Sequence, residues 1–193
     1  MISQELKVST SEKHRLLENL PLNRHLMSRN VRLEDYAQIL DLLYAIHLHL
    51  EKKIYFSLSS DVISQLEFNS HSTALLKDLK ELGIEEPKTT DRSWPESISN
   101  PSQALGCCYV LQGSLLGGIV IMRHLEKTFS EHIVSCPFHY YGQWADSPSF
   151  RWKNFTENLN KISYQSLFNR DDIIHGGRLT FDVFIDTFSF QGR

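Results

Sequence analysis

The chain has 193 residues, 41% of them hydrophobic and 22% charged, with a formal net charge of −3. These values are typical of one globular domain with a sizeable core, so a single domain over residues 1–193 is expected. The slight acidic balance excludes a general attraction to nucleic acid. The polar N-terminus lacks the apolar core of a signal peptide. Cys107, Cys108 and Cys136 form no CxxC pair, which disfavours a zinc ribbon and favours a reducing, cytoplasmic location.

Apolar residues recur at helical spacing along most of the chain, and no sustained alternation indicates strands. The pattern predicts helices at Glu5–Asn19, Leu33–Leu58, Ser72–Leu82, Ala104–Phe129, Arg151–Leu167 and Asp171–Phe188. The first helix is alternatively a shorter one capped by Thr10 or Ser11, and in either case Pro21 ends it. Glu85–Asn100 is predicted to be a polar connection, and Ser135–Pro148 to be irregular. The expected fold is an all-α domain of six to eight helices.

One apolar stretch, Leu105–Met122, carries Gly113, Gly117 and Gly118 inside a helical pattern. Each glycine costs a helix about 1 kcal/mol relative to alanine, so bare backbone must be useful there. A flat or bulky ligand lying against the main chain is one explanation, and tight packing of two helices is the other. The stretch has the length of a short membrane span, but its glycines and Ser114 favour a globular helix.

Nine histidines invite a metal hypothesis, but the chain contains no HExxH, no Glu-x-x-His, no GxSxG and no phosphate loop. His47 and His49 are too close in sequence to share a helix face, and most histidines are expected at the surface. His14 differs, because Lys7 and Thr10 precede it by seven and four residues on one helical face. It is therefore a candidate iron ligand, the alternative being an exposed or hydrogen-bonded histidine.

Basic and aromatic residues elsewhere also allow two interpretations. The cations can bind ligand carboxylates or belong to a solvated face. The phenylalanines of the last helix, three and four residues apart, suit a core or a ligand wall. The residues concerned are Lys7, Arg15, Arg151 and Lys153, and then Phe181, Phe184 and Phe188.

Taken together, these motifs resemble the heme oxygenase family. LKVSTSEKHRLLE (Leu6–Glu18) is similar to its N-terminal helix, and YVLQGSLLGGIVI (Tyr109–Ile121) to its distal helix. LYAIHLHLEKKI (Leu43–Ile54) and HSTALLKDLKELG (His71–Gly83) resemble the segments between them. The spacing from Trp152 to Phe188 fits as well, so the resemblance covers nearly the whole chain. It is greatest to the compact bacterial, biliverdin-forming branch.

The resemblance implies a heme, both cofactor and substrate, held between two helices, with His14 as the iron ligand. By position, Gly113, Ser114, Gly117 and Gly118 would form the catalytic distal helix. Lys7 and Lys153 would meet the propionates, and Phe181 would pack on the macrocycle. The full set of heme-binding residues implied in this way is Lys7, Thr10, His14, Glu18, Tyr109, Lys153 and Phe181.

The implied reaction converts heme to biliverdin, carbon monoxide and ferrous iron. It would use dioxygen and electrons from a ferredoxin, a flavodoxin or a reductase, because the chain shows no flavin or nicotinamide motif. A bilin-accepting phytochrome is a candidate partner, and no nucleic-acid or membrane partner is expected.

Two residues depart from the family pattern. Ser114 stands where many members carry an aspartate that orders distal water, and Glu157 stands where mammalian-type members use an arginine. These departures keep open a heme carrier or sensor without turnover. The same helical fold also leaves open a thiaminase-like protein that binds a small non-heme ligand. The departures also leave open which meso carbon of the heme is cleaved.

Overall fold

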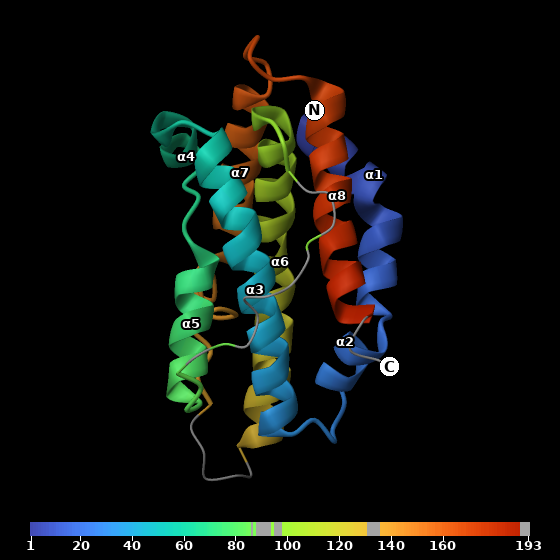
Figure 1. The fold of residues 1–193 in the computed structure, drawn as a ribbon, viewed down its shortest axis with the longest axis vertical. Coiled ribbons are helices and arrows are strands. Elements are labelled where there is room, and N and C mark those ends of the chain that lie inside the picture. Colours follow the sequence, from blue (N-terminus) through green and yellow to red (C-terminus); the bar gives the residue numbers. More distant parts are fainter. Residues whose placement is uncertain (86, 88–93, 95–97, 131–135, 190–193) are drawn as a thin grey trace.

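A computed structural model describes residues 1–85, 87, 94, 98–130 and 136–189. Over these residues the chain forms eight helices and no strand, which confirms the all-α prediction (Figure 1). The helices are α1 (Ile2–Glu18), α2 (Pro21–Leu26), α3 (Leu33–Ser57), α4 (Ser60–Gln65), α5 (His71–Glu81), α6 (Pro101–Phe129), α7 (Pro148–Ile162) and α8 (Arg170–Ser189).

The sequence prediction was wrong for two short helices and for the end of one longer helix. Pro21 was predicted only to end a helix, but it also starts α2, because its fixed φ suits the first turn and its missing N–H is not needed there. Helix α4 was not predicted; it is capped by Ser59, whose hydroxyl accepts the Val62 N–H at 3.4 Å. Helix α7 ends five residues before the expected end, at Ile162. Ser135 and most of Glu85–Asn100 lie outside the described residues.

Helix α6 is the central helix of the fold and packs against α8, α3 and α7. Among the described residues it is the one helix long and apolar enough to cross a membrane, yet over half of its most apolar window is buried inside the protein. Cys107, Cys108 and Leu111 are fully buried on it. Its apolar character is therefore that of a core helix.

Close contact between α6 and α8 depends on glycine. A Cβ on Gly106 would lie 2.0 Å from the Ile173 carbonyl oxygen, and one on Gly176 would lie 2.1 Å from the Gln103 carbonyl oxygen. No side chain fits at such distances, so the two backbones touch directly. Since α1 packs along the other side of α8, this crossing fixes the distance between α1 and α6, the two helices that border the cavity described below (Figure 1).

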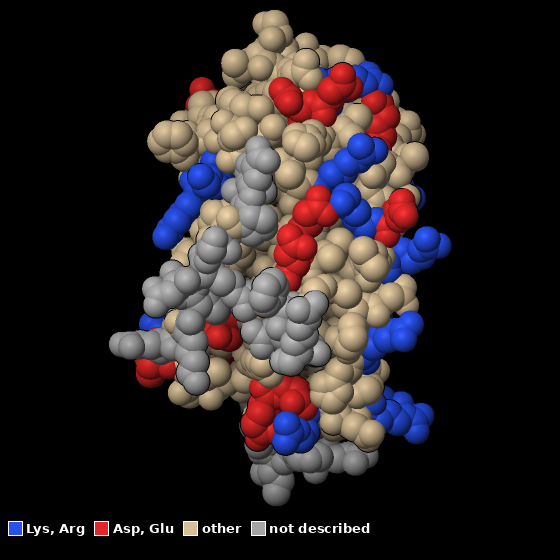
Figure 2. Space-filling view, turned by 45° about the vertical axis from the view of Figure 1, so that its right-hand side comes forward, with Lys and Arg blue, Asp and Glu red and all other residues tan. Residues whose placement is uncertain are grey.

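Charged residues of both signs share the molecular surface. On the face drawn in Figure 2, Lys and Arg project mainly along the right-hand edge, and Asp and Glu lie between them and toward the upper end. This mixture agrees with the small net charge of −3. The described part of this face thus has no large field of one sign that would attract a polyanion.

Candidate functional site

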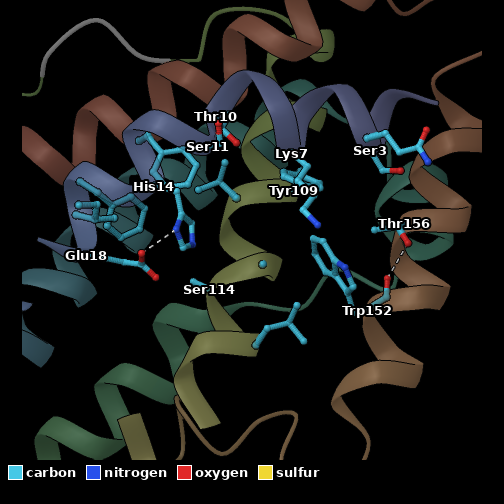
Figure 3. A pocket seen from close by; sticks show the side chains of 17 residues that line it. Ser3, Lys7, Thr10, Ser11, His14, Glu18, Tyr109, Ser114, Trp152 and Thr156 are labelled. Carbon is cyan, nitrogen blue, oxygen red and sulfur yellow. Dashed lines mark hydrogen bonds and ion pairs between the residues drawn. The ribbon is translucent and has the colours of Figure 1, made fainter. Parts of the chain in front are cut away.

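A cavity of about 600 Å³ lies between α1 and α6, with α7 and α8 completing its walls (Figure 3). Cofactor pockets commonly have volumes of ~300–1,000 Å³. Most of the residues predicted from the sequence line it: Lys7, Thr10, His14, Glu18, Tyr109, Gly113, Ser114 and Phe181. The other three predicted residues, Gly117, Gly118 and Lys153, are not part of this lining.

His14 and Glu18 form a side-chain pair on the α1 wall. The His14 Nδ1 atom lies 3.5 Å from a Glu18 carboxylate oxygen, one helical turn away (Figure 3). Phe181 of α8 presents its ring to the imidazole at 5.7 Å between centroids and 67° between planes. With the carboxylate at Nδ1, Nε2 is the ring nitrogen available to a metal, an arrangement that most metal-bound histidines share. The His14 side chain is 60% exposed.

Bare main chain of α6 faces His14 across the cavity. A Cβ on Gly113 would meet only the Trp152 ring, at 3.5 Å, which is ordinary contact. One turn later, a Cβ on Gly117 would meet no heavy atom within 4 Å. A Cβ on Gly118, by contrast, would lie 2.9 Å from the Tyr141 ring. Gly113 therefore exposes backbone to the cavity, whereas Gly118 permits packing against the non-helical segment that carries Tyr141 and not against another helix.

Ser114 has partners of its own in the core. Its hydroxyl donates to the Leu111 carbonyl at 2.7 Å and also lies 3.0 Å from the Tyr140 hydroxyl. Tyr140 in turn lies 3.0 Å from His47 Nε2. Burial raises the pKa of Tyr140, so it stays a neutral phenol that can both donate and accept. Ser114, one of the two departures from the family pattern, is thus joined to a buried tyrosine and histidine.

The two predicted cationic residues are placed differently. Lys7 lines the cavity and extends from α1 into the opening (Figure 3). Lys153 is 75% exposed, and its ammonium lies 3.9 Å from Glu157. Glu157, one of the two departures, is therefore partly neutralised by its neighbour. Thr10 lines the cavity too, but its hydroxyl donates its proton to the Leu6 carbonyl at 2.7 Å, so that proton is not available to a ligand.

Sequence reasoning missed several residues of the site. Trp152 lines the cavity, and its ring lies 5.2 Å from that of Tyr109, forming an aromatic end wall. Its position just before Lys153 was a usable signal, because both fall in the first turns of α7. Tyr140 lies in the segment predicted to be irregular, where nothing in the sequence indicates its contact with Ser114.

The fold and the site define a helical protein with a largely apolar cavity between two helices, bordered by an imidazole on one side and by bare main chain on the other. The chain belongs to the heme oxygenase family: the family model "Heme oxygenase" matches residues 1–189. It is 29% identical over 160 residues to a heme oxygenase of Xanthomonas campestris pv. campestris (strain 8004), covering 83% of this chain and 92% of that protein.

Solved structures agree with this assignment. The NO- and CO-bound heme oxygenase of Neisseria meningitidis is 25% identical and superposes with a TM-score of 0.71, covering 97% of this chain and 92% of that one. Heme oxygenase-1 of the cyanobacterium Synechocystis sp. PCC6803, solved in complex with heme, gives a TM-score of 0.73 at 13% identity, covering 98% and 91%. The second likeness shows the shared fold.

Proposed function

We propose that this heme oxygenase opens heme to biliverdin and releases carbon monoxide and ferrous iron. The observation that carries the proposal is the opposition of the His14–Glu18 pair and the bare Gly113 backbone across one cavity of about 600 Å³. The walls fit heme: an imidazole with a free Nε2, apolar and aromatic sides, and a lysine at the rim. A neutral histidine on one side of a heme iron leaves the other side open for dioxygen.

Each wall has a distinct task in this proposal. His14 holds the iron, and Glu18 keeps the imidazole in the tautomer that binds it. Lys7 pairs with a propionate, and Lys153 does so when it releases Glu157. Phe181 and Tyr109 pack on the macrocycle, and Thr10 contributes its methyl group to the same wall. Bound heme supplies both the iron that activates dioxygen and the carbon skeleton that is cleaved.

The α6 wall brings bare main chain to the cavity at one position between its side chains. Gly113 lets the ligand approach the main chain, and Gly117 extends the bare strip by one turn. Gly118 acts indirectly, because its contact with Tyr141 fixes how deeply α6 sits. Ser114 offers a neutral hydroxyl rather than a carboxyl group at this wall.

The surroundings of the reaction are part of the same proposal. Electrons come from a separate donor, such as a ferredoxin, a flavodoxin or a reductase. The protein works in the reducing cytoplasm, which suits its free cysteines, two of them deeply buried. Biliverdin released from it is available to a bilin-accepting protein such as a phytochrome.

Turnover with hemin tests the proposal directly. Purified protein is mixed with hemin, a ferredoxin–reductase system and oxygen, and the Soret band, bilin absorbance and carbon monoxide are followed. We expect the Soret band to decay as biliverdin and carbon monoxide form in equal amounts. A stable histidine-ligated Soret band without bilin would refute catalysis, and no Soret shift on adding hemin would refute heme binding.

A further inference from the structure

Three side chains of metal-binding type meet in the core, outside the lining of the cavity described above. They are His47 and Glu51, four residues apart on one face of α3, and His71 at the start of α5. Their ligand atoms all lie within 4.8 Å of one another. His47 is 0% exposed, His71 1% and Glu51 3%, so the protein encloses all three. Imidazole and carboxylate groups together are ligands that Zn²⁺ and similar divalent ions prefer.

Several polar atoms of this group have no hydrogen-bond partner among the described residues. They are Nδ1 of His47, Nδ1 of His71, and Oε1 of Gln112, an α6 residue beside His71. The Gln112 side chain is buried as well. An unpaired polar atom in a core destabilises the folded protein, and native structures contain few of them. Three such atoms at one place indicate a ligand that binds them together.

The tautomer of His47 follows from its neighbours. The Ser114 hydroxyl donates its proton to the Leu111 carbonyl at 2.7 Å, so its oxygen accepts the Tyr140 hydroxyl at 3.0 Å. Tyr140 has only that one proton to donate, so it accepts the Nε2 proton of His47 at 3.0 Å. Neutral His47 therefore carries a lone pair on Nδ1, which faces a Glu51 carboxylate oxygen at 3.7 Å. Two electron-rich atoms repel each other in a core unless a cation lies between them.

A metal ion fits these atoms better than a proton or a water molecule does. A proton on His47 Nδ1 would face its carboxylate acceptor at 3.7 Å, beyond hydrogen-bond distance, and would leave the atoms of His71 and Gln112 unpaired. A water molecule has two protons for two imidazole lone pairs, an amide oxygen and a carboxylate. Bonds of about 2.0–2.2 Å to a tetrahedral Zn²⁺ place two ligand atoms roughly 3.4 Å apart, close to the 3.7 Å between His47 and Glu51.

The hydrogen bonds of Glu51 hold its carboxylate in place and still allow a metal bond. One oxygen accepts the backbone N–H groups of His71 and Ser72 at 2.7 and 3.0 Å, and metal-binding carboxylates are commonly held in this way. The other oxygen accepts the hydroxyls of Ser70 and Ser72 at 2.8 and 2.6 Å. The Ser70 hydroxyl also lies 3.0 Å from that of Thr73, so it can turn there and release a carboxylate lone pair.

The surface beside this group offers a route to it. The Phe68 ring lies 5.5 Å from the His71 ring between centroids and covers it from outside. Phe68 also lines an open pocket of about 660 Å³, together with Glu67 and Asn69. Rotation of the Phe68 side chain would connect this pocket with His71, and the Glu67 carboxylate in the pocket attracts cations.

We propose that His47, Glu51 and His71 bind a divalent transition-metal ion such as Zn²⁺, with Gln112 as the fourth ligand. The ion joins α3, α5 and α6 and so stabilises the core. Two imidazoles favour this class of ion over Mg²⁺ and Ca²⁺, which prefer oxygen ligands. The site is separate from the heme iron, because none of its four residues lines the cavity. It does not depend on the heme reaction, so it can be tested apart from the proposed function.

Zinc binding by the heme-free protein tests the site. Full-length protein is stripped with a chelator, titrated with Zn²⁺ and desalted, and its metal content and Tm are measured. We expect one Zn²⁺ per chain, and a rise in Tm of about 5–10 °C at about a hundredfold excess over the dissociation constant. An anomalous difference map of crystals grown with Zn²⁺ should place the ion about 2.0–2.2 Å from Nδ1 of His47, Nδ1 of His71 and a Glu51 oxygen.

Three variants locate the metal. His71→Phe removes the unpartnered nitrogen but keeps a flat ring, so we expect a metal-free Tm near that of the wild type and no response to Zn²⁺. His139→Phe is the matched control, because it removes a histidine that pairs with a carboxylate at the surface, 2.9 Å from Glu81. His14→Ala removes the imidazole of the cavity. Both of these variants should still bind one Zn²⁺ per chain.

Several results would overturn the proposal. Wild-type protein that takes up no Zn²⁺, or a map that shows only a water molecule between His47 and His71, would do so. Zinc retained by His71→Phe, or lost from His14→Ala, would place the metal elsewhere and would also refute the site. If His71→Phe does not fold, the map of the wild-type protein decides. Zinc at His71 in a protein that makes no biliverdin from hemin would refute the proposed function alone.

Discussion

Substituting Gly113 separates the helical cost of this glycine from its benefit to the ligand. The Cβ of Gly113→Ala would lie 3.5 Å from the Trp152 ring, an ordinary contact, so the full helix-propensity gain of about 1 kcal/mol should appear in the heme-free protein. For a chain of this size that raises Tm by roughly 2–4 °C. Gly117→Ala, with nothing within 4 Å of its Cβ, should give the same gain. Gly118→Ala should not, because its Cβ would lie 2.9 Å from Tyr141.

Hemin binding is expected to respond in the opposite direction, because a side chain at Gly113 occupies space that the ligand needs. A leucine at Gly113 projects into the cavity, and we expect hemin affinity to fall at least tenfold, about 1.4 kcal/mol. Urea unfolding of the heme-free protein and Soret titration with hemin measure the two effects on the same samples. If Gly113→Ala destabilised the protein, the glycine would be there for packing. If Gly113→Leu bound hemin as tightly as wild type, the ligand would not lie against this backbone.

Three further predictions follow from single residues. His14→Ala should abolish the histidine-ligated hemin spectrum without lowering Tm, whereas His175→Ala, at an exposed histidine, should keep that spectrum. An unchanged spectrum in His14→Ala would show that His14 is not the iron ligand. Gly106→Ala should lower the free energy of unfolding by several kcal/mol or prevent folding, because its Cβ would lie 2.0 Å from the Ile173 carbonyl oxygen. Wild-type stability of this variant in urea would contradict the close crossing of α6 and α8. Burial, then the charge of His47, lowers the pKa of His71 to about 3, against about 6.5 in the unfolded chain. Below pH 6.5 the unfolded state therefore binds a proton that the folded state does not, so the stabilisation from neutral His71 is complete above pH 6.5 and declines toward pH 3. His71→Asn should flatten the decline of the unfolding free energy between pH 6.5 and 4. An equally steep decline in the variant would show that His71 is not its source.

The sequence allowed the local parts of the site to be predicted. His14 and Glu18 are four residues apart on one helix, so their contact follows from helical geometry. The three α6 glycines were read as one set, although their spacing already separates them. At 3.6 residues per turn, Gly117 lies about 40° around the helix from Gly113, and Gly118 about 140°. The structure places Gly118 against Tyr141 accordingly.

Contacts between residues that are far apart in the sequence could not be predicted from local sequence patterns. His47 was considered only with its neighbour His49, while its partner Tyr140 lies 93 residues away. Helices α2 and α4 have six residues each, too few to display a period of 3.6. The Gly106–Ile173 contact likewise depends on how two helices cross, which neither helix specifies alone.

A crystal structure of the hemin complex is the most direct measurement of the central claim. The account predicts the iron bonded to His14 Nε2, with Glu18 at Nδ1 and the α6 main chain at Gly113 on the opposite side of the macrocycle. Iron held by another residue, or a side chain filling the space between Gly113 and the porphyrin, would contradict it.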